Sequence, residues 1–95
     1  MNGPRKATSE DIERMSQVVA LVGSYDIGES KGDYKHFAHM TRELHDEHGL
    51  EGLRATAKFA WMLLESIEAS SGVDKDDVLS WYGIKFATRA EELRE

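Results

Sequence analysis

The segment of residues 50–71, LEGLRATAKFAWMLLESIEASS, would be apolar around most of its circumference as a helix. One face carries Leu50, Leu53, Ala57, Ala60, Trp61, Leu64 and Ile67, and a second face carries Phe59, Met62 and Leu63. The clearly polar wedge is narrow and contains Glu51, Arg54, Lys58 and Glu65. Because a helix of this kind is normally buried on most sides, we expect 50–71 to be the central helix on which the rest of the chain packs.

Hydrophobic periodicity predicts three further helices, at about 8–24, 33–48 and 74–93. Thr8, with Asp11 three residues later, is the pattern of a capping box at the start of the first. The stretch DIGESKG, residues 26–32, contains two glycines and no periodic pattern, which predicts a loop. No alternating apolar and polar run indicates a β-strand.

The predicted fold class is therefore all-α, a compact four-helix bundle around a central hydrophobic third helix. A length of 95 residues fits one domain. We assign residues 8–95 to this helical domain and residues 1–7 to a flexible N-terminal tail. A chain this short buries a modest core, so a partner subunit often contributes to its stability.

The charge balance bears on the class of partner. Eighteen acidic residues against twelve basic ones give a formal charge of -6, which disfavours sequence-independent binding to phosphate backbones and leaves cationic partners open. The chain has no cysteine, which excludes thiol chemistry and fits a reducing cytoplasm. Its longest unbroken apolar run, Phe59 to Leu64, is far too short to span a bilayer. We therefore expect a cytoplasmic protein without a membrane segment.

The stretch SSGVDKDDVLSWYG, residues 70–83, resembles the helix-turn-helix motif of DNA-binding regulators over about twenty residues. The positions that the motif gives to its turn glycine and packing residues hold Ile67, Gly72, Val73, Val78 and Trp81. The resemblance implies that the helix after the turn would enter the major groove. That helix opens with Asp74, Asp76 and Asp77 against a single cation, Lys75. Three carboxylates repel the duplex, whereas they suit the first turn of any helix.

Metal binding and catalysis have little support in the sequence. Four histidines lie on the predicted second helix, at His36, His39, His45 and His48. They point in different directions, so they cannot converge on one ion, and His48 is expected to be half-buried near the helix end. No phosphate-binding loop and no recognisable nucleophile setting occurs. We expect neither an enzyme nor a bound cofactor or metal.

The last predicted helix offers the strongest functional signal. Its apolar stripe is formed by Val78, Leu79, Tyr82, Phe86, Ala90 and Leu93. Trp81 and Ile84 lie well off this stripe, and Asp77 and Thr88 fall on the same side. Aromatic anchors beside polar residues are typical of protein interfaces.

The sequence thus predicts a small acidic, non-enzymatic protein-binding module, expected to form a homodimer. Trp81, Ile84, Asp77 and Thr88 are its candidate partner-binding residues, and a basic protein is the favoured partner. The alternatives are a DNA-binding transcription regulator of helix-turn-helix type and an acidic protein that inhibits by mimicking DNA.

Overall fold

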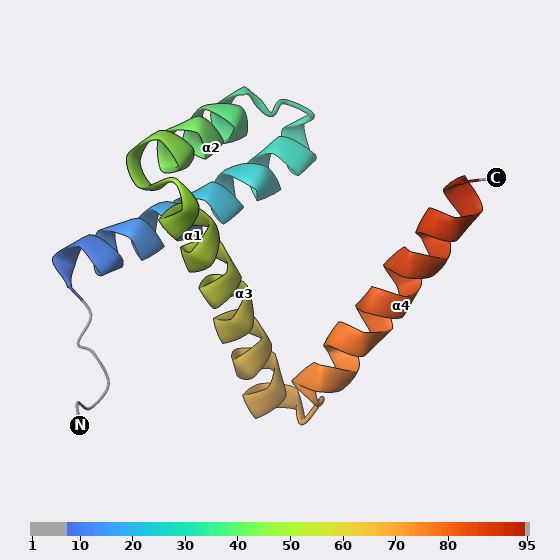
Figure 1. The fold of residues 1–95 in the computed structure, drawn as a ribbon. Helices are drawn as coiled ribbons and strands as arrows, with labels where there is room; N and C mark the ends of the chain where they lie inside the picture. The colour runs from blue at the N-terminus through green and yellow to red at the C-terminus, as the bar shows by residue number, and fades with distance from the viewer. Residues whose placement is uncertain (1–7, 95) are drawn as a thin grey trace. The chain divides into compact units, whose positions relative to one another are not determined.

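The computed structural model describes residues 8–94, and this part of the chain consists of helices joined by short turns, without a strand (Figure 1). The helices are α1 (Ser9–Lys31), α2 (Lys35–His48), α3 (Leu50–Ser71) and α4 (Lys75–Leu93). The all-α prediction is confirmed, and the bounds of α3 agree with the predicted segment 50–71. The tail predicted at residues 1–7 lies outside the described residues.

Helix α1 is two turns longer than predicted, and the loop assigned to 26–32 is wrong. The helix continues to Lys31 and ends at Gly32, whose φ of 70° is left-handed and whose N–H donates to the carbonyl of Gly28 at 2.7 Å. Gly28 itself is buried inside the helix. A Cβ on it would lie 2.6 Å from Cδ1 of Tyr34, so this glycine allows a close approach between helix and ring instead of marking a turn.

The capping box at the start of α1 is confirmed. The backbone N–H of Asp11 donates to Oγ1 of Thr8 at 3.1 Å, and the N–H of Thr8 donates to Oδ2 of Asp11 at 3.0 Å. Two backbone donors that a helix start leaves without partners are thereby satisfied.

Thr8→Ala is expected to lower the free energy of unfolding by about 1 kcal/mol, because it removes the acceptor for the Asp11 N–H. Chemical denaturation followed by circular dichroism measures the change. Ser9→Ala, at the neighbouring exposed position, is the matched control and should stay within about 0.5 kcal/mol of the original protein. Equal losses in the two variants would contradict the capping role.

Helices α1 and α2 run alongside one another and form the packed part of the structure (Figure 1). Val18 of α1 and Leu44 of α2 are the buried apolar side chains among the described residues. The ring of Tyr25 contacts Phe37 edge-on at 5.1 Å between centroids, and it lies 5.8 Å from the ring of Tyr34. This pair of helices therefore has a small core with an aromatic cluster at one end.

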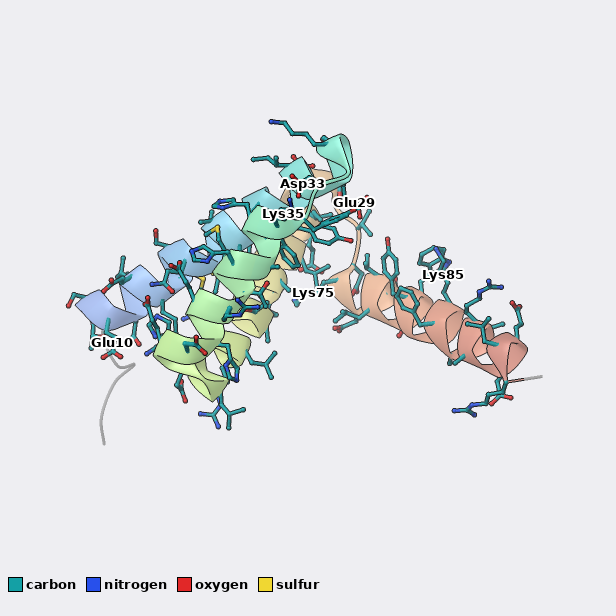
Figure 2. All side chains as sticks on the ribbon, turned by 90° about the horizontal axis from the view of Figure 1, so that it is seen from above. Glu10, Glu29, Asp33, Lys35, Lys75 and Lys85 are labelled. Atoms are coloured by element: carbon teal, nitrogen blue, oxygen red, sulfur yellow. The ribbon has the colours of Figure 1, made fainter. Side chains whose placement is uncertain are left out.

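The turn between α1 and α2 is stabilised by Asp33. Tyr34 is the N-cap residue of α2, and its side chain makes no capping hydrogen bond. Asp33 accepts a hydrogen bond from the backbone N–H of Lys35 at 3.1 Å. Figure 2 shows Glu29, Asp33 and Lys35 near this turn.

The chain divides into two compact units, Met1–Ala60 and Trp61–Glu95. The first contains α1, α2 and the start of α3, and the second contains the rest of α3 and α4. Within the described residues of the second unit, 61–94, none is buried. The assignment of 8–95 to one domain stays a prediction.

The bundle around the third helix is not confirmed. In the first unit, Leu50 and Leu53 of α3 are exposed, and in the second unit so are Met62, Leu63 and Ile67. Gly52 is the buried residue of α3, and it lies against Leu44. The prediction of a long helix with a broad apolar surface is therefore correct, and much of that surface is exposed to solvent in the structure.

Candidate protein-binding surface

Helix α4 has apolar side chains on two opposite sides and no buried residue. Its exposed large apolar side chains are Leu79, Trp81, Tyr82, Ile84, Phe86 and Leu93. Single exposed apolar residues are common on protein surfaces, but contiguous apolar patches mark interaction sites. Such a helix is suited to contacts with other protein surfaces.

The first side contains the four residues that the sequence analysis selected. Asp77, Trp81, Ile84 and Thr88 follow one another at intervals of four, three and four residues, which places them on one side of the helix. All four are exposed, with Trp81 at 57% and Ile84 at 69%. Trp81 and Ile84 thus form an exposed apolar pair, with the carboxylate of Asp77 before it and the hydroxyl of Thr88 after it.

Neighbouring side chains restrain the ring of Trp81. The ammonium of Lys85, labelled in Figure 2, lies 4.9 Å from the centroid of the Trp81 ring, within the range of a cation–π interaction. The ring of Tyr82 meets that of Trp81 edge-on at 4.7 Å between centroids. An anchor held in this way loses less conformational entropy when a partner covers it.

The opposite side of α4 is the stripe that was predicted to face the core, formed by Val78, Leu79, Tyr82, Phe86, Ala90 and Leu93. Val78 is partly buried and the other five are exposed, with Phe86 at 64%. The rings of Tyr82 and Phe86 stack at 6.1 Å between centroids. Sequence reasoning missed this side as a candidate binding surface, because periodicity shows that a face is apolar but not which chain covers it.

The start of α4 is built from carboxylates that cap the helix. Asp74 is the N-cap, and its Oδ1 accepts from the backbone N–H of Asp76 at 2.8 Å. The ammonium of Lys75, the cation of this turn, lies 3.5 Å from Glu68 and 3.8 Å from Glu65. The negative charge of Glu65, followed by that of Glu68, raises the pKa of Lys75 above its ordinary value.

This electrostatic arrangement bears on the resemblance to helix-turn-helix proteins. The cation at the supposed groove-reading end is engaged by two carboxylates of its own chain. Asp76 and Asp77 remain in the first turn as acidic groups. A phosphate backbone approaching this end would meet net negative charge, which opposes binding.

The first unit contains a polar contact between α1 and α2. The Nε of Arg14 donates to Nδ1 of His48 at 3.2 Å, and Nε2 of Gln17 donates to Glu47 at 2.8 Å. The side chain of His48 is 8% exposed. As a residue, His48 is half-buried, as predicted, and the guanidinium of Arg14 on α1 is its hydrogen-bond donor.

The four histidines of α2 lie apart, with His39 paired to Glu43 at 3.1 Å and His45 beside Asp46 at 3.3 Å. Within residues 8–94, no group of three or more His, Asp or Glu side chains could hold a metal ion.

At the other end of the α1–α2 pair, a hydrogen bond to Glu29 raises the pKa of Tyr25. Partial burial, followed by Glu29, raises the pKa of Tyr34.

The first unit also has an apolar depression of about 520 Å³. Its lining includes Leu21, Phe37, Leu44, Leu50, Leu53 and Thr56. The depression joins the exposed start of α3 to the surface of α1 and α2. The first unit therefore has an exposed apolar surface of its own.

No protein-family model, curated protein or solved structure matches this chain. Across the described residues, no helix has the combined length and apolar character that crossing a membrane requires. The surface itself is therefore the basis for a functional proposal.

Proposed function

We propose that this chain is a small acidic, non-enzymatic protein-binding module that acts in the cytoplasm as a homodimer. In the dimer, α3 becomes the buried centre of a helical bundle. The side of α4 that carries Trp81 and Ile84, with Asp77 and Thr88, contacts a protein partner. The observation that carries the proposal is the exposure of apolar side chains on both sides of α4, which has no buried residue of its own.

A second copy is favoured as the partner because α3 and α4 each have apolar side chains on more than one side. Helix α3 is apolar outside a narrow polar wedge, and α4 has an apolar stripe with Trp81 and Ile84 opposite it. Contact between α3 and α4 of the same chain would cover one side of each helix and leave the other exposed. Burial of one large apolar side chain contributes about 1.5–3 kcal/mol, so covering the remaining sides would strongly favour association.

The partner-binding side of α4 has the chemistry of an interface anchor. Tryptophan is enriched among the residues that dominate binding energy, and Trp81 is exposed beside Ile84. The carboxylates of Asp76 and Asp77 stand in the first turn of the same helix. They would attract a basic partner and raise its rate of association.

The experiment replaces Trp81 by Ala and compares the proteins captured from the native cell by the original chain and by the variant. We expect at least one protein to bind the original chain and to be lost from Trp81→Ala, because removing such an anchor costs about 2 kcal/mol or more. Helicity, measured by circular dichroism, should be unchanged. Ser80→Ala, an exposed neighbour on the same helix, is the matched control and should retain the protein.

Two outcomes would overturn the assignment of this surface. Loss of helicity in Trp81→Ala would mean that the indole is part of the core of the protein. Capture of the same proteins by both variants would mean that Trp81 contacts none of them. Binding of duplex DNA at low salt, with a steep dependence on salt concentration, would support the helix-turn-helix alternative instead.

A further inference from the structure

The five exposed residues of the apolar stripe on α4 have a spacing that reads the same in both directions. Leu79, Tyr82, Phe86, Ala90 and Leu93 are separated by three, four, four and three residues, with Phe86 at the centre. Helical spacing of three and four residues keeps these side chains on one side of the helix. Two antiparallel copies of such a stripe can therefore meet in register around a twofold axis.

We propose that α4 pairs with α4 of a second copy in antiparallel orientation, with the twofold axis at Phe86. This inference rests on the proposed homodimer and names one of the surfaces that form it. The axis brings Leu79 against Leu93 of the second copy and the two Phe86 rings against one another. It also brings the bulky Tyr82 against the small Ala90 of the second copy, and facing large and small side chains pack well.

The charges beside the stripe favour the antiparallel orientation. Asp76 and Arg94 are eighteen residues apart, which places them on the same flank of the helix. The antiparallel pair brings Asp76 of one copy near Arg94 of the other, whereas in a parallel pair these two residues stay at opposite ends of the helices. Arg94 now contacts Glu91 at 3.1 Å on the exposed surface, and an exposed pair of this kind is easily exchanged for another.

The two sides of α4 then have separate roles. Trp81 and Ile84 lie opposite the stripe and stay accessible to a further protein. Lys85 lies on the flank of the stripe opposite Asp76 and Arg94, near the twofold axis. Its ammonium is already attracted by the face of the Trp81 ring of the same chain. This contact would reduce the repulsion between the two Lys85 side chains in the pair.

The test uses the absence of native cysteine from the chain. Leu79→Cys and Leu93→Cys are prepared as two separate full-length variants and treated with a short bismaleimide, alone and as an equal mixture. We expect a covalent dimer in the mixture and at least tenfold less in either variant alone. Tyr82→Cys and Ala90→Cys form a second pair with the same expected result, and circular dichroism identifies any variant that fails to fold.

Each alternative has its own outcome. Covalent dimers in each single variant alone would show a parallel pair and overturn the inference. No crosslink in any mixture, with a dimer mass by sedimentation, would overturn this pairing and leave the proposed homodimer standing. A monomer mass for the original chain would overturn both, and would point to the chain's own α3 as the cover for the stripe.

Discussion

Leu63→Asp is expected to dissociate the homodimer, although Leu63 is 46% exposed in the single chain. Leu63 belongs to the second apolar face of α3, with Phe59 and Met62, and this face lies inside the proposed homodimer. An unpaired carboxylate buried there costs several kcal/mol. A cost of about 3 kcal/mol corresponds to a dissociation constant raised about 100-fold. Sedimentation equilibrium over a concentration series measures this shift.

Ala69→Asp is the matched control for this experiment. Ala69 is exposed on the same helix, and its spacing from Glu51, Lys58 and Glu65 places it on the polar wedge. The new carboxylate would stay in water, so we expect a change within about 1 kcal/mol, most of it from the negative end of the helix dipole. If Leu63→Asp behaves like Ala69→Asp, the second apolar face of α3 is not part of an interface.

Gly28→Ala is expected to lower the free energy of unfolding by about 1–2 kcal/mol. The new Cβ would lie 2.6 Å from Cδ1 and 2.9 Å from Cε1 of Tyr34, with the carbonyl of Asp33 at 3.3 Å. Overpacking of this kind costs about 1–3 kcal/mol, which exceeds the gain in helix propensity from Gly to Ala. Thermal and chemical unfolding of the variant measure the net loss.

Gly23→Ala, on the same helix, separates crowding from propensity. A Cβ at Gly23 meets nothing within 4 Å, so propensity alone should stabilise this variant by about 0.5–1 kcal/mol. The two substitutions are chemically identical and should change stability in opposite directions. Stabilisation by both would show that Tyr34 does not pack against α1 as the structure has it.

The parts of the fold that were predicted correctly depend on local signals. The periodicity of 50–71 gave the bounds of α3, and Thr8 with Asp11 gave the start of α1. The error at 26–32 came from treating Gly28 as a sign of a loop. Its role is the contact with Tyr34, six residues away, and nothing in the local pattern indicates such a contact.

The candidate site was predictable in part for a related reason. Trp81 and Ile84 were selected because they lie off the apolar stripe of their helix, and both are exposed in the structure. Phe86 was assigned to the core because it lies on that stripe, and it is exposed as well. A helical pattern identifies apolar faces, but tertiary and quaternary packing decide which of them are covered and by what.

Sedimentation equilibrium of the full chain shows whether a second copy covers the apolar surfaces of α3 and α4. At tens of micromolar protein, we expect a mass of twice the 10.7 kDa of the chain, falling towards the monomer on dilution. A mass of 10.7 kDa throughout that series, with full helicity, would contradict it.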